Sequence, residues 1–236
     1  MVFFATFSTQ HVVSSICLPR NTRLEIQPIL TCHDLTVVSG EALLRSDFGT
    51  GPLLDACMAT STLTNLEVWA AREAGAMEAS VPISFNITPP HLACPEFTGA
   101  ILRAISGSRV TVEILETHPV TTESLAGIRE LKAHGVEFAL DDFGTGFSDW
   151  TQVELVRPNK LKFDRSWLNG PAKALLGAIR RAQDMGMKTV VEGVEHLWQF
   201  EMAQDAGANA VQGFRFSRSL PLNDFNAFVE RQSLNA

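Results

Sequence analysis

Seven successive apolar segments of the sequence each carry a polar or charged residue in the segment or at its end. These residues are Glu41, Asn86, Glu113, the pair Asp141 and Asp142, Lys162, Glu192 and Gln212. Each one alone has a structural explanation, such as a strand end that faces water, a turn residue or a helix N-cap. Burying an unpaired charge in an apolar segment is costly, however, so seven repetitions favour one site where these side chains meet.

The residue types indicate metal-assisted chemistry. The five carboxylates and the carboxamide of Asn86 offer only hard oxygen ligands, which select Mg²⁺ or Mn²⁺ over zinc or copper. Adjacent aspartates such as Asp141 and Asp142 can serve two ions, and two ions about 3.5–4 Å apart form the clamp used for phosphoester cleavage. Lys162 can orient a water molecule or stabilise developing negative charge, and Glu192 can bind metal or act as a general base.

Strand-like and helix-like segments alternate along the chain, which predicts the element types that must position these residues. The expected strands are 24–30, 36–44, 81–87, 110–115, 136–141, 160–164, 188–193 and 208–213. The expected helices are 60–74, 95–105, 122–134, 149–156, 172–185, 197–206 and 223–232. Eight strands alternating with helices predict an α/β fold, a TIM-like (β/α)8 barrel, with a doubly wound sheet as the main alternative.

The first connection, residues 31–35, is too short for a parallel crossover, which needs about a dozen residues. We therefore expect a barrel with an antiparallel first strand that pairs with the second as a hairpin. Gly75, Gly135, Gly186 and Gly207 follow expected helices, and glycine is common directly after a helix ends. In such barrels chemistry occurs at the carboxyl ends of the strands, which is where the polar residues fall.

Composition narrows the class of protein. The chain has 236 residues and a net charge of −7, which disfavours non-specific binding to DNA or to an anionic membrane. No apolar run approaches the ~20 residues of a membrane span, and the N-terminus lacks the features of a secretory signal, so we expect a cytoplasmic protein without membrane insertion. Four cysteines without a C-x-x-C pair fit reduced thiols. We expect an N-terminal segment, 1–23, and one barrel domain, 24–236.

Several segments together are similar to one known family. They are Glu41-Ala42-Leu43-Leu44-Arg45, Ser84-Phe85-Asn86-Ile87-Thr88, Glu113-Ile114-Leu115-Glu116, Asp141-Asp142-Phe143-Gly144-Thr145-Gly146-Phe147-Ser148, Leu161-Lys162-Phe163-Asp164, Glu192-Gly193-Val194-Glu195 and Gln212-Gly213-Phe214. In this order they resemble the EAL-domain family of cyclic-di-GMP-specific phosphodiesterases, over residues 24–230. The resemblance implies a barrel with an antiparallel first strand and hydrolysis of cyclic-di-GMP to linear 5'-pGpG, in which two Mg²⁺ or Mn²⁺ ions activate the attacking water.

The resemblance also implies roles for individual residues. One ion is expected at Glu41, Asn86, Glu113 and Asp141, and the second at Asp141, Asp142 and Glu192. Lys162 is expected to position the attacking water, and Glu192 is the candidate general base. The expected substrate-binding residues are Gln27, Leu44, Arg45, Asp164, Glu195 and Gln212. Glu116 is expected to fix the loop after the aspartate pair, and a homodimer is expected.

Two other functions remain open at this point. The stretch 46–55 is short and lacks the tryptophan usual in the family, which would fit a catalytically weak protein that binds cyclic-di-GMP or a protein partner. An unrelated Mg²⁺-dependent lyase or isomerase acting on a phosphosugar would need a glycine-rich phosphate loop after strand seven or eight. Gln212-Gly213-Phe214-Arg215 matches such a loop poorly.

Overall fold

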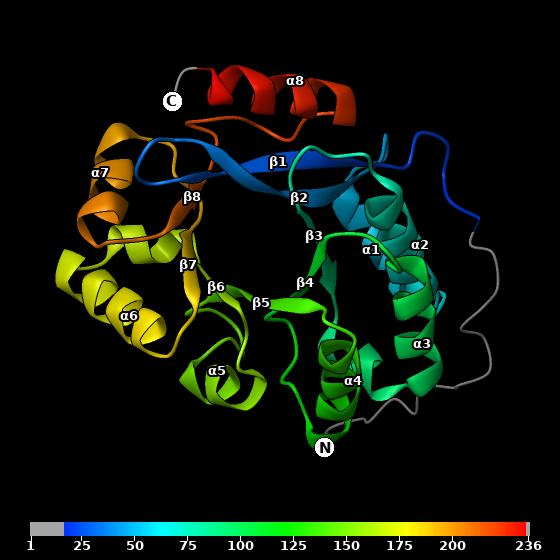
Figure 1. Ribbon diagram of the computed structural model, residues 1–236. Coiled ribbons are helices and arrows are strands. Elements are labelled where there is room, and N and C mark those ends of the chain that lie inside the picture. The colour runs from blue at the N-terminus through cyan, green and yellow to red at the C-terminus, as the bar shows by residue number, and fades with distance from the viewer. Residues whose placement is uncertain (1–16, 235–236) are drawn as a thin grey trace.

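Eight strands close into a barrel in the order of the chain in the computed structural model, which describes residues 17–234 (Figure 1). The strands are β1 (Arg23–Thr31), β2 (Val37–Arg45), β3 (Ile83–Ile87), β4 (Val110–Ile114), β5 (Glu137–Phe143), β6 (Lys160–Phe163), β7 (Lys188–Val191) and β8 (Ala210–Gln212). The predicted TIM-like (β/α)8 fold is confirmed, and the doubly wound sheet is excluded because the sheet is closed.

The first strand is antiparallel to both of its neighbours, as the short connection predicts. β1 pairs antiparallel with β2, with Gln27 opposite Glu41, and antiparallel with β8, with Ile29 opposite Gln212. The Thr31 N–H donates to the Thr36 carbonyl at 2.9 Å and closes the hairpin. The other neighbouring strands pair in parallel.

The helices surround the barrel, and α8 lies beside β1 and β2 (Figure 1). They are α1 (Thr50–Ala59), α2 (Leu63–Ala76), α3 (Pro95–Ala104), α4 (Thr122–Ala133), α5 (Trp150–Val156), α6 (Ala172–Asp184), α7 (Leu197–Asp205) and α8 (Leu222–Ser233), with short 3₁₀ helices η2 (Pro89–Ala93) and η3 (Arg165–Asn169). The sequence prediction missed α1. This helix buries only Leu53 and Cys57, a single i, i+4 pair, so its helical periodicity is weak.

The main apolar core lies between the strands and the helices. Phe85, Phe138 and Phe163 point outward from the barrel and are almost fully buried in this layer. Inside the barrel, Ile29, Val190 and Ala210 form a small apolar cluster. They share the inner face of their strands with Gln212 and Lys162, because paired and alternate strand residues point to one side. The barrel interior therefore has an apolar layer near the polar residues.

The glycine predictions are correct at three positions and wrong at one. Gly135, Gly186 and Gly207 follow α4, α6 and α7 with φ of 82°, 84° and 79°, in the left-handed region that favours glycine. Gly75 does not end its helix, because α2 continues to Ala76. A Cβ at Gly75 would lie 2.7 Å from the Ala104 carbonyl oxygen, so this glycine instead allows α2 to approach the end of α3.

The expected division of the chain remains a prediction. β1 begins at Arg23, but residues 1–16 of the expected N-terminal segment lie outside the described residues. Within residues 17–234, no helix is both long enough and apolar enough to cross a membrane.

Candidate active site

A buried lysine lies among four carboxylates on the inner face of the barrel. Lys162 on β6 is 1% exposed. Its Nζ lies 2.6 Å from Glu113 Oε2, 2.8 Å from Asp141 Oδ1, 2.8 Å from Glu192 Oε1 and 3.0 Å from Glu41 Oε2. We call Lys162 and these four carboxylates the Lys162 cluster. The four acidic residues come from β2, β4, β5 and the residue directly after β7.

Strand register explains why residues so distant in sequence meet. Asn86 on β3 pairs with Glu113 on β4, and Gln27 on β1 pairs with Glu41 on β2. Paired residues place their side chains on the same face of a sheet, so these four point into the barrel together. The structure brings the residues that we expected to converge into contact inside the barrel: Glu41, Asn86, Glu113, Asp141, Lys162, Glu192 and Gln212.

Two amide side chains complete the hydrogen bonding of Glu41. Gln212 Nε2 donates to Glu41 Oε2 at 2.8 Å and to Gln27 Oε1 at 3.2 Å, while Asn86 Nδ2 donates to Glu41 Oε1 at 3.1 Å. The carbonyl oxygens Asn86 Oδ1 and Gln212 Oε1 are buried and accept no hydrogen bond among the described residues. A buried acceptor without a partner is costly. The Asn86 oxygen, beside carboxylates, is therefore available as a cation ligand.

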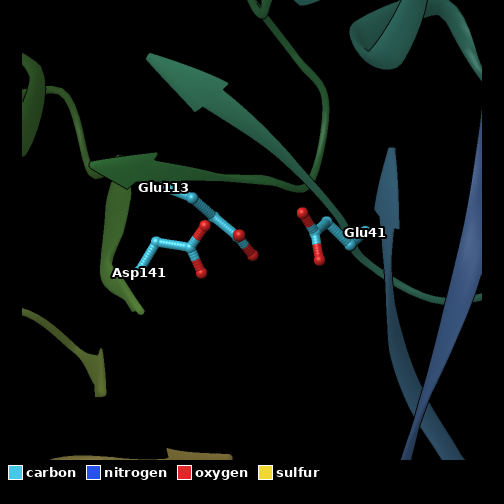
Figure 2. A group of neighbouring side chains, drawn as sticks. All are labelled: Glu41, Glu113 and Asp141. Atoms are coloured by element: carbon cyan, nitrogen blue, oxygen red, sulfur yellow. The ribbon is translucent and has the colours of Figure 1, made fainter. Parts of the chain in front are cut away.

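The carboxylate oxygens form two groups that could hold a metal ion. Glu41, Glu113 and Asp141 each contribute an oxygen, and these oxygens lie within 4.8 Å of one another; Figure 2 shows the three side chains converging. Oxygens of Glu116, Asp141 and Asp142 meet the same limit. Asp141 belongs to both groups. Carboxylate and carboxamide oxygens are the ligands that Mg²⁺ and Mn²⁺ prefer, so the residues present fit such ions.

An irregularity in β5 allows consecutive aspartates to serve one site. The register between β5 and β6 shifts between Leu140 and Phe143, and Asp142 has a φ of 46°. Such bulges re-aim side chains, and aspartate tolerates the left-handed region better than most residues. Burial, followed by the nearby Asp141 and Glu116 charges, raises the pKa of Asp142 to about 6.

Burial and mutual repulsion shift the pKa values of the Lys162 cluster. Burial raises the pKa of Glu113 to about 8; the attraction of Lys162 opposes this rise, and repulsion from Glu41 and Asp141 adds to it. Burial likewise raises the pKa of Asp141 and raises that of Glu192 well above its usual range. Burial alone would also raise the pKa of Glu41, but Lys162, Gln212 and Asn86 bring it below its usual value. Without a bound cation, the cluster therefore retains protons that a divalent ion would replace.

These shifts predict how metal-free stability depends on pH. Between the ordinary glutamate pKa of 4.5 and the raised value of about 8, Glu113 is protonated in the folded chain and ionised in the unfolded chain. The folded state then binds more protons, so stability falls as pH rises through this window. We expect the Tm measured in EDTA to fall between pH 5 and pH 8, and Glu113→Gln to flatten this slope. An equally steep slope in the Glu113→Gln variant would contradict the assignment.

Glycines allow the loop after the aspartate pair to pack closely on its neighbours. Gly144 has a φ of 100°, and a Cβ there would lie 2.4 Å from Trp167 Nε1, which donates to the Phe143 carbonyl at 2.6 Å. A Cβ at Gly146 would lie 2.6 Å from the Glu116 carbonyl oxygen, which accepts the Phe147 N–H at 2.9 Å. The main chain of Glu116 thus holds the loop, while its carboxylate lies near Asp141 and Asp142.

Gly144→Ala is therefore expected to lower the free energy of unfolding by about 1–3 kcal/mol, because it combines a strained φ with a steric clash. Chemical denaturation measures this change. Gly170→Ala is the matched control, since its backbone is extended and its nearest neighbour, the Trp167 carbonyl oxygen, would lie 3.5 Å from the added Cβ. Equal stability of the two variants would contradict the described loop packing.

Four other predicted site residues lie apart from the Lys162 cluster. Arg45 donates from Nε and Nη2 to Ser219 Oγ at 3.2 and 2.8 Å, and Ser219 Oγ donates to Glu25 Oε2 at 2.8 Å. Leu44 packs against the apolar cluster of α1 and α2. Asp164 Oδ1 accepts the Ser166 N–H, and Glu195 is exposed. No side chain of these four predicted residues hydrogen-bonds to the cluster within residues 17–234, and their roles remain predictions.

The sequence reasoning missed two polar residues that hold Arg45. Ser219 follows β8, and Glu25 lies two residues before Gln27 on β1. Glu25 Oε2 also lies 3.5 Å from Arg45 Nε. Alternation along β1 places Glu25 on the face of Gln27, which is the one signal in the sequence that could have linked it to the site.

Comparisons with known proteins agree with this geometry. The family model of the EAL domain matches residues 18–219. A curated relative, "Probable cyclic di-GMP phosphodiesterase PdeN" of Escherichia coli, is 30% identical over 177 residues, which cover 68% of this chain and 34% of that protein. The chain spans about a third or less of the length of the first curated relatives it matches.

Two solved structures are similar to the barrel. "PaMucR Phosphodiesterase, c-di-GMP complex" has a TM-score of 0.78 and 26% identity, with 87% of this chain and 99% of that chain covered. A manganese and cyclic-di-GMP complex of BlrP1 from Klebsiella pneumoniae at pH 6 has a TM-score of 0.76 and 25% identity, with 88% of this chain and 58% of that chain covered.

Proposed function

Because the chain belongs to the EAL domain family, we propose that it hydrolyses one phosphodiester bond of cyclic-di-GMP to give linear 5'-pGpG. The observation that carries this proposal is the Lys162 cluster, in which three strands and the residue directly after β7 bring four carboxylates around the buried Lys162 ammonium. The names of the relatives and the complex of PaMucR suggest that the substrate is cyclic-di-GMP. The hard oxygen ligands suggest that the reaction depends on divalent cations.

The proposed ligands divide into two overlapping sets. Glu41, Asn86, Glu113 and Asp141 would hold one Mg²⁺ or Mn²⁺ ion. Asp141, Asp142 and Glu192 would hold the second, directly or through water. When bound, such ions polarise phosphoryl oxygens and lower the pKa of water. The fit is supported by the two groups of close carboxylate oxygens and by the unpartnered Asn86 oxygen.

Side chains of the cluster would carry the proton transfer and the charge stabilisation. Glu192 would accept a proton from the attacking water, a role that requires its carboxylate to be ionised. The Lys162 ammonium, 2.8 Å from Glu192, would position that water and stabilise the negative charge that develops on the phosphoryl oxygens. The oxygen of the attacking water would form the new P–O bond while the bond to the ribose O3' breaks, and O3' would take up a proton from solvent to become the free hydroxyl of pGpG.

The proposed substrate-binding residues lie at and around the Lys162 cluster, and Arg45 is the one with a positive charge. Arg45 lies four residues after Glu41 on the same strand face, and its guanidinium suits a phosphate oxygen. Gln27 and Gln212 would order the site through their hydrogen bonds near Glu41. Leu44, Asp164 and Glu195 are the other proposed substrate-binding residues. Glu116 would stabilise the loop that follows Asp141 and Asp142.

Turnover of cyclic-di-GMP tests the proposal. The purified chain is incubated with the nucleotide and either Mg²⁺ or Mn²⁺, and the products are separated by chromatography. We expect linear pGpG with at least one ion and none in EDTA. Folded protein that yields no pGpG with either ion would contradict the catalytic proposal. Nucleotide binding by calorimetry without turnover would instead support the function of a binding module.

We also propose that the chain is cytoplasmic and that it forms a homodimer, as the family resemblance implies. Light scattering on the purified chain measures the assembly directly. A mass equal to one chain over the whole accessible concentration range would contradict the dimer.

A further inference from the structure

A buried glutamate outside the Lys162 cluster contacts the segment that follows one of its strands. Glu67 lies on α2, is 6% exposed, and shares the buried face of that helix with Ala71 and Ala74. Burying a carboxylate is costly unless hydrogen bonds compensate. A charged residue at this position therefore needs a reason that packing of α2 does not supply.

Both carboxylate oxygens of Glu67 are occupied by Thr88 and His91. Glu67 Oε1 accepts the Thr88 N–H at 3.0 Å and the Thr88 hydroxyl at 2.6 Å, and Oε2 lies 2.7 Å from His91 Nδ1. Thr88 directly follows β3, and His91 lies on η2. Glu67 thus bonds the residue at which the chain leaves the barrel sheet.

This contact fixes where β3 ends. The last β3 residue, Ile87, still accepts the Leu115 N–H at 3.2 Å. The next N–H, that of Thr88, donates to Glu67 and not to a neighbouring strand. Farther along, a Cβ at Gly127 would lie 2.1 Å from the Leu92 carbonyl oxygen, so α4 packs directly on the backbone of η2. Glu67 is the anchor nearer to β3, and α4 is the more distant one.

Asn86 lies only two residues before Thr88. Its Nδ2 donates to Glu41 Oε1, and its buried Oδ1 accepts no hydrogen bond among the described residues. A shift of Thr88 would move the backbone that carries Asn86, because a short strand transmits displacement along its length. The orientation of the Asn86 oxygen therefore depends on the anchor at Thr88.

We propose that Glu67 is a positioning residue that holds the Asn86 oxygen in place as a ligand for a divalent cation. This inference rests on the proposed function, since it takes Asn86 as a ligand. Glu67 acts through Thr88 and touches neither the ion nor the nucleotide. Residues that orient metal ligands typically affect metal affinity even though they lie outside the coordination sphere.

Calorimetric titration of the metal-free chain with Mn²⁺ tests the proposal. Glu67→Leu removes the carboxylate that accepts from the Thr88 N–H and hydroxyl and lies beside His91 Nδ1, and we expect its Kd for Mn²⁺ to rise about tenfold or more. Glu67→Gln keeps the shape and one acceptor, so its Kd should stay close to that of the wild type. Thr88→Val removes only the hydroxyl and should give an intermediate Kd. An unchanged Kd in the folded Glu67→Leu variant would overturn the proposal.

Asn209→Ala is the matched control. Asn209 Oδ1 accepts the Thr189 N–H at 2.8 Å and its hydroxyl at 3.1 Å, which is the same pattern near the start of β7. This variant should lower Tm but leave the Kd for Mn²⁺ unchanged. Equal weakening in Asn209→Ala and Glu67→Leu would overturn the proposal, because general loosening would then explain both.

Further outcomes separate this proposal from the proposed function. If Glu67→Leu fails to fold, Thr88→Val decides, and an unchanged Kd in that variant overturns the positioning role. Wild-type protein that binds Mn²⁺ but does not hydrolyse cyclic-di-GMP would contradict the proposed function, while the comparison of Kd values still tests Glu67. Wild-type protein that binds no Mn²⁺ would overturn both.

Discussion

Asp141→Asn is expected to lower the rate of cyclic-di-GMP hydrolysis by roughly 10³-fold while the barrel remains folded. Asp141 contributes an oxygen to both carboxylate groups, and its Oδ1 lies 2.8 Å from Lys162 Nζ. Asparagine keeps the size of the side chain but removes the negative charge that two cations would share. The change should also weaken Mn²⁺ binding, which calorimetry measures alongside product formation.

Asp184→Asn provides the control for this loss of one negative charge. Asp184 is exposed on α6. Its substitution makes the same change in net charge, but Asp184 belongs neither to the Lys162 cluster nor to the two groups of close carboxylate oxygens. Its turnover should match that of the wild type. Equal activity of Asp141→Asn and Asp184→Asn would mean that the assigned ligands are wrong. We expect Glu41→Ala to lose turnover as well, relative to Asp184→Asn.

Lys162→Met should abolish turnover and also destabilise the metal-free chain. The substitution leaves Glu41, Glu113, Asp141 and Glu192 without the cation that contacts all four. Removing one partner of a buried ionic network costs about 3–5 kcal/mol, although protonation of the carboxylates offsets part of this cost. We expect a Tm in EDTA lower by roughly 10 °C. Mn²⁺ should restore much of this loss, because it supplies positive charge to the same carboxylates.

Lys132→Met distinguishes a metal-linked effect from the general loss of a hydrogen-bonded, half-buried lysine. Lys132 Nζ donates to the Val156 and Arg157 carbonyl oxygens at 2.7 Å each and contacts no carboxylate of the cluster. This variant should lose stability without a larger response to Mn²⁺. A Lys162→Met variant whose Tm responds to Mn²⁺ no more than that of Lys132→Met would contradict the account.

The barrel and the converging residues were predictable from sequence for identifiable reasons. Each strand is a short apolar run that carries a polar residue on its inner face. Because this pattern repeats from strand to strand, it indicates that the polar side chains meet inside the barrel. The short connection at 31–35 predicts the antiparallel β1, because chain length alone excludes a crossover.

Other features depend on contacts that sequence spacing does not encode. Helix α1 has few buried residues, and Gly75 serves close packing of α2 on α3, although it resembles a helix-ending glycine. The left-handed Asp142 and the Ser219 contact with Arg45 arise from the bulge in β5 and from a loop that returns to β1. The sequence gives only weak evidence for Glu67, a charged residue on the buried face of α2, because its partners Thr88 and His91 come after β3.

Hydrolysis in water enriched in ¹⁸O tests the central claim most directly. Mass spectrometry of the product of the wild-type chain with cyclic-di-GMP and Mn²⁺ should find linear pGpG with one ¹⁸O atom in its terminal phosphate, since water attacks phosphorus and the ribose O3' leaves. The same mixture in EDTA should return unchanged cyclic-di-GMP. Unlabelled pGpG, or labelled pGpG formed equally well in EDTA, would contradict attack by water in a metal-dependent site.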